Sequence, residues 1–534
     1  MLAKPKLRHN PVVLIVLDGW GVSLPSSGNA ISESKIPNFN SYCSHYPVAT
    51  LQASGEATGL PWGESGNSEV GHMSIGAGRI VYQELTRVNA SISSKAFFSN
   101  QAFLRSFEHI RETNGVLHLI GIISTGGVHG HIEHLYALIE LAHERGIKNV
   151  VVHGILDGRD SGYASAKPFI EEISRRLEPL NGVIGSLSGR FYAMDRDHHW
   201  DRVQKAYSAI ALGESKEISA DPLEALNISY GKNIYDEEFI PTAITNTKNI
   251  RTTIESGDSI IFFNIRADRT RQLASCFLDP VFGQFKTKKL EQIFFVTMTS
   301  YDTTLPAVIA YPQLEIKKSL SEIISSHNLS QLHIAETEKY AHITYFLNDG
   351  REEPFPNERR IMIPSPAVDS YDKKPEMGAF QITNEVVSAL AKDEYDFYAI
   401  NYANADMVGH TGNIAATITA IQTLDLCFRT LVPLILQKNG AVLITADHGN
   451  AENLFDLKTG IIDKEHTNNP VPCIIITKEY EGRAFSLCDV QNGDLSVLEP
   501  SGLLSDVAPT LLDLLGIPQP SEMTGRSLLK ELDS

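Results

Sequence analysis

The sequence lacks an excess of positive charge. Across its 534 residues, Asp and Glu outnumber Lys and Arg by 64 to 46, and the formal net charge is −18. Proteins that bind nucleic acid or an anionic membrane neutralise phosphates with a basic surface. The charge balance therefore argues against nucleic acid and membrane lipid as partners, although a small phosphate could still bind at a local group of cations.

Cysteine is scarce, and its spacing is irregular. The five cysteines are Cys43, Cys276, Cys427, Cys473 and Cys488, and no CxxC pair occurs among them. Disulfide scaffolds and zinc knuckles need regularly spaced sets of cysteine. Neither is indicated, and a reducing, cytoplasmic compartment is expected.

No apolar run approaches the roughly 18 residues that a membrane-spanning helix needs. Lys4, Lys6 and Arg8 precede the apolar residues 12–17 and loosely imitate a signal peptide. That run is short, has no small-residue cleavage site after it, and ends in the turn-forming sequence DGWG (18–21). We interpret residues 12–17 as a strand of the folded protein.

What the sequence does contain is a series of short apolar runs that alternate with helical patterns. Because these runs are continuous rather than alternating, they are typical of parallel strands covered by helices on both faces, so the expected class is α/β. The runs are residues 11–17, 115–123, 149–156, 259–265, 397–402, 441–446 and 473–477. Polar or proline-containing stretches at 82–87 and 310–312 are the expected domain boundaries, whereas 217–248 and 489–500 are expected to be surface insertions.

Charged side chains follow several runs, namely Asp18, Asp157, Arg266, Asp406 and Asp447. Open α/β sheets bind ligands at the carboxyl ends of their strands.

The spacing of Asp406 and His410 places both side chains on one face of a helical turn. His448 and His466 add further imidazoles, and such oxygen and nitrogen ligands suit divalent metals. Singly, an Asp after a strand is more often a helix cap, and a lone His more often a core residue. Their recurrence at successive strand ends favours a metal site.

Ser68 lies in the glycine-rich sequence GESGNSEVGHMSIGAG (63–78). A loop of this kind that enters a helix favours an anion, and the alternative is that Ser68 is a helix cap or turn residue. A serine hydroxyl needs a base or a metal to become a nucleophile, and no GxSxG motif competes for that role. We hypothesise that Ser68 is the nucleophile of a phosphoryl transfer.

Arginines gather in three motifs of the central segment, DGRDSG, SGRFYAMDRD and NIRADR. A guanidinium binds phosphate or carboxylate with two hydrogen bonds, so the motifs indicate a small dianionic substrate. Internal salt bridges within DGRD and DRD are the alternative.

His129, His131 and His134 could form a third metal site, but contact with substrate or proton transfer is the preferred interpretation. Lys339 in ETEKYAH could place an ammonium near the phosphate or the nucleophile.

The motifs LDGWG, GNSEVGH, DGRD, NIRADR, TEKYAH, DMVGHTG, TADHGN and HTNNPVP occur in this order along nearly the whole chain. Together they closely resemble the cofactor-independent (2,3-bisphosphoglycerate-independent) phosphoglycerate mutase family of the alkaline phosphatase superfamily. The resemblance implies an alkaline-phosphatase-like, metal-binding domain formed by residues 1–82 and 315–534. It also implies a substrate-binding, transferase-like α/β domain inserted at 83–314.

The resemblance also implies the site residues and cofactors. Asp406, His410 and His466 would hold one divalent ion, and Asp18, Ser68, Asp447 and His448 the other, with manganese expected at both. The positions that match the family's substrate-binding residues are His129, Arg159, Asp160, Arg190, Arg196, Arg266, Arg269 and Lys339. No 2,3-bisphosphoglycerate is required, and a monomer is expected.

The implied reaction moves the phosphoryl group of 3-phosphoglycerate to Ser68 and back to the 2-hydroxyl. Asp160 is the preferred candidate for proton exchange, and the inserted domain is expected to close on hinges at 82–87 and 310–312. Two alternatives stay open: a hydrolase or phosphopentomutase of the same superfamily, and a non-catalytic metal-binding or scaffolding protein descended from such an enzyme.

Overall fold

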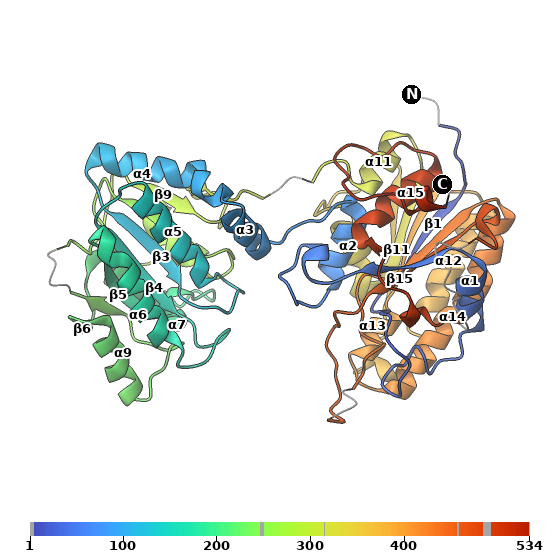
Figure 1. Cartoon of the computed structure of the whole chain (residues 1–534), viewed down its shortest axis with the longest axis horizontal. Helices are drawn as coiled ribbons and strands as arrows, with labels where there is room; N and C mark the ends of the chain where they lie inside the picture. Colours follow the sequence, from blue (N-terminus) through green and yellow to red (C-terminus); the bar gives the residue numbers. More distant parts are fainter. Residues whose placement is uncertain (1–4, 246–249, 314–315, 456–458, 484–492, 533–534) are drawn as a thin grey trace. The chain divides into compact units, whose positions relative to one another are not determined.

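A computed structural model describes residues 5–245, 250–313, 316–455, 459–483 and 493–532. Over this part of the chain it divides into two compact units, which Figure 1 shows. Unit 1 is Met1–Gln83 with Glu315–Ser534, and unit 2 is Glu84–Leu314. Some predicted features lie outside the described residues, namely Cys488, Lys248, residues 489–492 and the expected 314/315 boundary. The other four cysteines are buried free thiols: Cys43, Cys276, Cys427 and Cys473.

Unit 1 is a mixed sheet with helices packed against it, in the strand order β12-β11-β13-β1-β14-β15-β2-β16. Its strands are β1 (Val12–Leu17), β2 (Val48–Gln52), β11 (Gln331–Glu336), β12 (Glu358–Ile363), β13 (Phe397–Tyr402), β14 (Ala441–Thr445), β15 (Val471–Ile476) and β16 (Gly502–Leu503). Its helices are α1 (Pro37–His45), α2 (Ser68–Ala77), α11 (Leu320–Ser326), α12 (Ala379–Ala391), α13 (Asn404–Gly409), α14 (Ile414–Gln437) and α15 (Val507–Leu515).

The central strands of unit 1 confirm the interpretation of the apolar runs. Every residue of β1 is fully buried, between the parallel neighbours β13 and β14. Burial of such a side chain is worth about 1.5–3 kcal/mol. The expectation of parallel pairing is wrong for β15, which runs antiparallel to both β14 and β2. The described residues between β14 and β15 form no helix, and a parallel return usually needs a helical crossover.

Unit 2 has a second sheet, in the strand order β10-β9-β8-β3-β4-β5-β7-β6. Its strands are β3 (Leu117–Ile122), β4 (Val150–Leu156), β5 (Val183–Gly189), β6 (Glu217–Ser219), β7 (Thr242–Ile244), β8 (Ser259–Phe262), β9 (Phe294–Thr297) and β10 (Val308–Ile309). Its helices are α3 (Glu84–Ser93), α4 (Gln101–Thr113), α5 (Ile132–Glu144), α6 (Ala166–Leu177), α7 (Arg190–Ala193), α8 (Trp200–Tyr207), α9 (Pro222–Gly231) and α10 (Arg271–Leu278). Both units have the α/β architecture that the sequence predicts.

The described part of the segment 217–248, residues 217–245, is not a surface insertion, which corrects the prediction for these residues. It forms β6, α9 and β7, and β7 pairs antiparallel with β5. Leu226 and Phe239 from this segment are 0% and 1% exposed and belong to the core of unit 2. Its strands are only three residues long, too short for a period in the sequence to reveal them.

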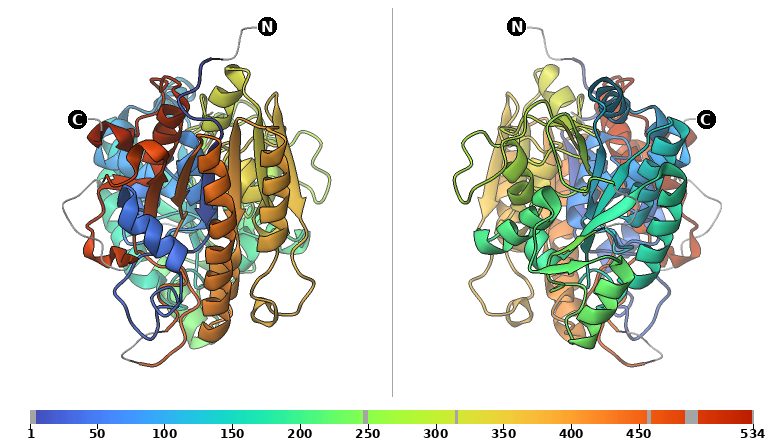
Figure 2. Two further views of the ribbon diagram at one scale, coloured as in Figure 1. Left: turned by 90° about the vertical axis from the view of Figure 1, so that its right-hand side faces the viewer. Right: turned by 90° about the vertical axis from the view of Figure 1, so that its left-hand side faces the viewer.

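Helix α14 corrects the expectation that no apolar stretch approaches the length of a membrane-spanning helix. Among the residues that the structure describes, it is the one helix long and apolar enough, by length and composition alone, to cross a membrane. Its most apolar stretch is 56% buried within the protein, and Phe428 and Leu431 pack into the core of unit 1. The left-hand view of Figure 2 shows this helix, in orange, lying against the sheet. Threonines and two charged residues break the apolar run in the sequence, but the mean hydropathy of the helix, 1.4, is still high enough for a membrane-spanning helix.

Candidate metal centre and anion-binding cluster

The three central strands of unit 1 bring predicted ligands to one edge of the sheet. Leu17 at the end of β1 lies opposite Tyr402 at the end of β13, so Asp18 and the α13 turn with Asp406 follow side by side. Gly19 has a φ of +74°, and a Cβ there would lie 2.7 Å from the Cα of Asp406. Only glycine allows this close approach.

Asp406, His410 and His466 converge on one position. His410 Nε2 lies 3.1 Å and His466 Nε2 3.3 Å from Asp406 Oδ1. The two Nε2 atoms are 3.1 Å apart. The spacing of four between Asp406 and His410 therefore places both groups on one face, as predicted, and His466 joins them from a distant loop.

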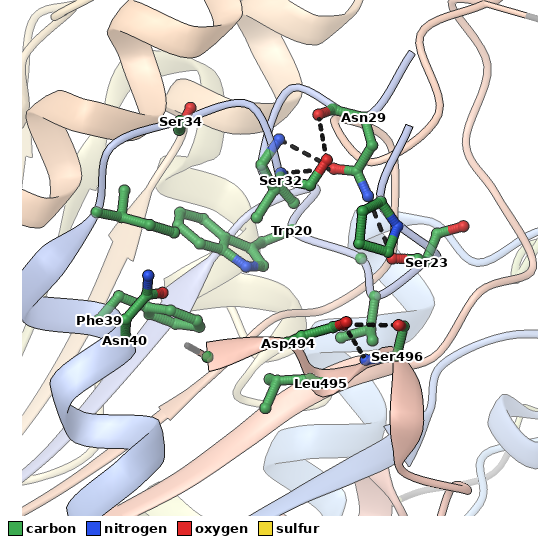
Figure 3. A pocket seen from close by; sticks show the side chains of 16 residues that line it. Trp20, Ser23, Asn29, Ser32, Ser34, Phe39, Asn40, Asp494, Leu495 and Ser496 are labelled. Carbon is green, nitrogen blue, oxygen red and sulfur yellow. Dashed lines mark hydrogen bonds between the residues drawn. The ribbon is translucent and has the colours of Figure 1, made fainter. Parts of the chain in front are cut away.

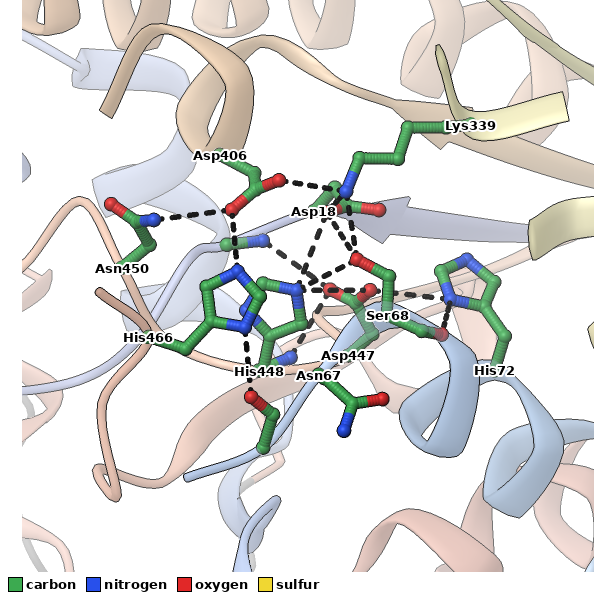
Figure 4. A network of polar contacts seen from close by, with 12 residues as sticks. Asp18, Asn67, Ser68, His72, Lys339, Asp406, Asp447, His448, Asn450 and His466 are labelled. Atoms are coloured by element: carbon green, nitrogen blue, oxygen red, sulfur yellow. Dashed lines mark hydrogen bonds and ion pairs between the residues drawn. The ribbon is translucent and has the colours of Figure 1, made fainter. Parts of the chain in front are cut away.

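Ser68 lies among the other predicted ligands, as Figure 4 shows. Its hydroxyl donates to Asp18 Oδ1 at 3.2 Å and lies 2.9 Å from His448 Nε2. His448 Nε2 is 3.5 Å from Asp447 Oδ2. The four residues Asp18, Ser68, Asp447 and His448 thus surround one small volume.

The first turn of helix α2 holds Ser68 in place. Asn67 caps the helix by accepting a hydrogen bond from Val70 N at 3.0 Å, which confirms that the glycine-rich loop enters a helix. A Cβ on Gly71 would lie 2.5 Å from Asp447 O, so glycine lets the helix pack directly on the Asp447 loop. The helix N-terminus contributes a favourable field for an anion at Ser68.

Lys339 joins the two ligand groups. Its ammonium lies 2.6 Å from Asp18 Oδ1 and 2.7 Å from Asp406 Oδ2, and it donates to Ser68 Oγ at 2.7 Å. Burial disfavours the charged form of this side chain, but Asp18, Asp406 and Asp447 outweigh that effect and raise its pKa above the ordinary value. Lys339 is therefore a buried cation beside the predicted nucleophile.

The donor set fits divalent cations. Asp18, Asp406 and Asp447 are almost fully buried, and Asp447 Oδ2 has no hydrogen-bond partner in the described structure. Groups of such ligand atoms, Asp406 with His410 and His466 and Asp18 with Asp406 and His448, lie close enough to share an ion. Buried carboxylates need a compensating cation, and the Lys339 ammonium alone cannot balance three of them. Carboxylate oxygens and imidazoles are ligands for ions of this kind.

Protons compete for the imidazoles of this centre. Burial alone would lower the pKa of His448, but Asp447 and Asp18 raise it to about 9. The hydrogen bond to Asp406 raises the pKa of His410 above its usual value. A metal binds the neutral imidazole, so binding must release these protons.

Sequence reasoning missed Glu452, a carboxylate that ties the ligand loops together. It accepts hydrogen bonds from Gly21 N at 3.1 Å and Asn450 N at 2.8 Å, and from Asn469 Nδ2 at 3.0 Å. These partners lie in the loops that carry Asp18, His448 and His466. No local pattern marks Glu452, because its partners Gly21 and Asn469 lie 431 and 17 residues away in sequence.

Three other polar residues were also missed: His72, Asn401 and Asn450. Asn450 Nδ2 donates to Asp406 Oδ1 at 3.2 Å, and Asn401 Nδ2 donates to Asp18 Oδ2 at 2.8 Å and lies 3.0 Å from His72 Nε2. A signal for Asn401 was available, because it is a polar residue inside the otherwise buried run 397–402. His72 lies four residues after Ser68 and so shares its helix face.

Unit 2 gathers the predicted basic residues beyond the carboxyl ends of β8, β4 and β5. Arg190 is only 3% exposed, and its Nη1 lies 2.5 Å from both Asp157 Oδ1 and Asp160 Oδ2. Asp157 and Asp160 of DGRD therefore pair with an arginine of another motif, whereas the described ion pair of Arg159 is with Glu237. The pairing with Arg190 fixes Asp160, the predicted proton-exchanging group, against a buried guanidinium.

The other arginines of this cluster are more open. The side chains of Arg159, Arg196 and Arg266 are 59%, 53% and 55% exposed. Asp268, which sequence reasoning missed, lies 3.5 Å from Arg196 and 3.7 Å from Arg266. Cations that are close together and incompletely neutralised can bind a small anion.

Arg269 is partly buried, and its Nη1 donates to Met194 O at 3.2 Å. Burial and the nearby Arg196 and Arg190 lower its pKa. Arg269 therefore lies within the positive field of the cluster.

The three histidines of residues 129–134 do not converge on a shared ligand position within the described structure. His131 caps helix α5, and His134 Nε2 lies 3.0 Å from Asn89 Oδ1. Burial and then Arg190 lower the pKa of His129 to about 4, so its imidazole is neutral near pH 7. Its Nδ1 lies 3.7 Å from Asp268 Oδ1 and makes no hydrogen bond. His129 thus places a buried imidazole nitrogen, without a hydrogen bond in the described structure, beside the basic cluster.

Unit 1 also contains a pocket of about 440 Å³ beside Trp20 and Phe39, shown in Figure 3. Serines, asparagines and apolar side chains line it, and Asp494 is its one charged residue among the described lining. Cationic donors form the strong, charge-assisted hydrogen bonds that bind a phosphate. The pocket therefore lacks the charge that the metal centre and the basic cluster provide.

Comparison with known proteins gives consistent matches. A family model described as "BPG-independent PGAM N-terminus (iPGM_N)" matches residues 88–303. The chain is 46% identical over 524 residues to a 2,3-bisphosphoglycerate-independent phosphoglycerate mutase of Moorella thermoacetica, with 98% of each chain covered. It is 45% identical over 527 residues to the protein of the same name from Clostridium perfringens, with 98% of this chain and 100% of that one covered. A crystal structure of Leishmania mexicana phosphoglycerate mutase at low cobalt concentration has a TM-score of 0.57 and 28% identity, with 98% of this chain and 99% of that one covered.

Proposed function

Because this chain belongs to the 2,3-bisphosphoglycerate-independent phosphoglycerate mutase family, we propose that it interconverts 3-phosphoglycerate and 2-phosphoglycerate through a phosphoserine at Ser68. One observation carries the assignment of the nucleophile. Ser68 Oγ lies within 3.2 Å of Asp18, His448 and Lys339, in a buried centre suited to divalent ions. The reaction is a step of glycolysis and gluconeogenesis, and it needs no 2,3-bisphosphoglycerate.

In the proposed first transfer, Ser68 Oγ attacks the phosphorus of 3-phosphoglycerate and the bond from phosphorus to the 3-oxygen breaks. The serine proton leaves, and the departing 3-oxygen takes a proton to give glycerate. In the second transfer, the 2-hydroxyl of glycerate loses its proton and attacks the phosphoserine, which frees Ser68. Two transfers with opposite proton movements leave atoms and charge balanced.

Divalent ions, when bound, would lower the pKa of the serine hydroxyl and stabilise negative charge on the transferring phosphoryl group. We propose Asp406, His410 and His466 as ligands of one ion, and Asp18, Ser68, Asp447 and His448 as ligands of the other. Manganese is the proposed metal. Lys339 would add a fixed positive charge beside the attacking oxygen.

The basic cluster of unit 2 would bind the carboxylate and hydroxyl groups of the same substrate. The proposed residues are His129, Arg159, Asp160, Arg190, Arg196, Arg266 and Arg269, together with Lys339 of unit 1. Asp160 would exchange protons with the glycerate hydroxyls, because its carboxylate lies at the partly exposed edge of the Arg190 pair.

Residues 1–82 with 315–534 would thus be the metal-binding domain, and 83–314 the substrate-binding domain. The predicted domain closure stays a prediction, as do the monomeric state and the cytoplasmic location.

A coupled enolase assay on 3-phosphoglycerate, without 2,3-bisphosphoglycerate, tests this proposal. We expect activity that a chelator removes and Mn²⁺ restores, and at least a thousandfold loss in Ser68→Ala, an order-of-magnitude expectation for removal of a nucleophile. Full activity of Ser68→Ala would overturn the assignment. Release of inorganic phosphate without isomerisation would instead identify a hydrolase, and binding without either reaction a non-catalytic protein.

A further inference from the structure

His72 is a fully buried imidazole that the proposed reaction leaves without a role. It lies on helix α2, one turn after Ser68, and its exposed fraction is 0%. Figure 4 shows it on the far side of Ser68 from the imidazole of His466. Both ring nitrogens have polar neighbours, so its hydrogen bonding can be deduced.

The partners of Nδ1 fix the position of one proton. This nitrogen lies 2.8 Å from the carbonyl oxygen of Ser68 and 3.2 Å from Asp447 Oδ2. A carbonyl oxygen and an ionised carboxylate only accept hydrogen bonds. His72 Nδ1 therefore carries a hydrogen and donates it to the Ser68 carbonyl oxygen, while Asp447 Oδ2 lies nearby without a hydrogen bond to the ring.

The other nitrogen is fixed through Asn401. Asn401 Nδ2 donates to Asp18 Oδ2 at 2.8 Å and lies 3.0 Å from His72 Nε2. A flipped amide would set its oxygen against the Asp18 carboxylate, so the amide nitrogen must face Asp18. Its second hydrogen then points at His72 Nε2, which accepts it and carries no proton.

From these contacts we infer that His72 is a positioning residue that holds Asp18, through Asn401, in register with the backbone of Ser68, with Asp447 Oδ2 packed 3.2 Å from its ring. Both carboxylates belong to the same proposed metal set. A ring with hydrogen on Nδ1 and none on Nε2 satisfies both the Ser68 carbonyl and the Asn401 amide, and these two contacts together are called the His72 relay. The inference rests on the proposed function for the role of Ser68, but the geometry of the carboxylates does not depend on it.

His72 could alternatively be a metal ligand, because its ring and the carboxylates of Asp18 and Asp447 lie close enough to share an ion. The hydrogen bonds argue against this. A metal at Nδ1 would displace the 2.8 Å contact with Ser68, and a metal at Nε2 would displace the Asn401 amide. Groups that orient metal ligands commonly change metal affinity or activity about tenfold to a hundredfold when they are replaced.

Two substitutions of His72 each keep a hydrogen-bonding group near one ring nitrogen and remove the group at the other. His72→Asn keeps an amide donor near the position of Nδ1, whereas His72→Gln places an amide oxygen near that of Nε2. His333→Asn is a matched control, because His333 is also fully buried in unit 1 and its Nδ1 also meets a backbone carbonyl, that of Ile343 at 2.7 Å. Each variant is measured by calorimetric titration of the chelator-treated full chain with Mn²⁺, by thermal unfolding, and by kcat and KM.

We expect both His72 variants to bind Mn²⁺ about tenfold to a hundredfold more weakly, with unchanged stoichiometry. Their kcat should fall by a larger factor than the factor by which KM for phosphoglycerate changes. His333→Asn is expected to lower the Tm while Mn²⁺ affinity stays within about twofold. In Asn401→Ala, adding His72→Asn should weaken Mn²⁺ binding less than it does in the wild type, because the relay is already broken.

Two results would overturn the inference. One is a loss of one bound Mn²⁺ per chain in both His72 variants, which would make His72 a ligand. The other is a fall in Tm with Mn²⁺ affinity unchanged, as in the control, which would make His72 only a core residue. Because metal affinity is read without turnover, failure of the mutase proposal would be seen separately, in the wild-type assay.

Discussion

Lys339 Nζ donates to Ser68 Oγ at 2.7 Å, and 271 residues separate the two in sequence. The same ammonium contacts Asp18 and Asp406 at 2.6 and 2.7 Å. One buried cation thus lies beside the nucleophile and between carboxylates of both proposed metal sets. Its charge compensates part of the negative charge of these buried carboxylates.

We expect Lys339→Met to destabilise the metal-free protein by about 3–5 kcal/mol, the usual cost of leaving a buried charge unpaired. Divalent ions would replace part of the lost positive charge, so Mn²⁺ should stabilise the variant more than the wild type. Denaturant unfolding in chelator and in Mn²⁺ measures both effects. Lys392→Met, which removes an exposed lysine paired with Glu394, is the control and should change stability by less than about 1 kcal/mol.

Metal affinity should rise with pH. The pKa of His448 is raised to about 9 in the absence of metal, because Asp447 and Asp18 outweigh the effect of burial. Below that pH a bound proton must leave before the imidazole can coordinate an ion. Titration with Mn²⁺ at pH 6.5, 7.5 and 8.5 should give increasing affinity and proton release. An affinity independent of pH would show that His448 is not a ligand.

Unit 2 should lose stability in mild acid. Burial lowers the pKa of His134 to about 3 and also lowers the pKa values of His118 and His153. Each folded-state pKa lies below the unfolded value of about 6.5, so below that pH the unfolded chain binds more protons. The free energy of unfolding should therefore fall from pH 6.5 downward, by up to about 1.4 kcal/mol per pH unit for each histidine.

His134→Gln isolates one contribution to this acid sensitivity. The glutamine amide can still donate to Asn89 Oδ1, which lies 3.0 Å from His134 Nε2, but it does not titrate. Denaturant unfolding between pH 7.5 and 5.5 should show a shallower slope for the variant, by about one proton. Parallel slopes for wild type and variant would contradict the prediction.

Asp268 should compete with substrate for the open arginines. It lies 3.5 Å from Arg196 and 3.7 Å from Arg266, and all three side chains are about one-third exposed or more. Solvent screening limits such pairs to about 0.2–1 kcal/mol, so Asp268→Asn should lower KM by no more than about fivefold. Steady-state kinetics on 3-phosphoglycerate measure this effect. Glu171→Gln removes a charge from the exposed face of α6 and should leave KM unchanged, whereas an increased KM in Asp268→Asn would indicate that Asp268 supports binding.

The sequence predicted the strands and the ligands that follow them because both signals are local. A buried parallel strand needs a continuous apolar run, and residues 12–17, 397–402 and 441–446 provide it around β1, β13 and β14. The spacing of Asp406 and His410 follows from the period of a helix alone. Resemblance to a known family then related these local signals to one reaction.

Only the tertiary structure decided which polar groups meet. Asn401 and His72 are 329 residues apart, and Glu452 lies 431 residues from its partner Gly21, so no sequence period connects them. The antiparallel direction of β15 and the pairing of Arg190 with Asp157 and Asp160 likewise depend on how distant segments pack. The sequence by itself determined the chemical groups at the strand ends. The fold determined which proton, carboxylate and cation each group faces, because hydrogen bonds form between neighbours in space.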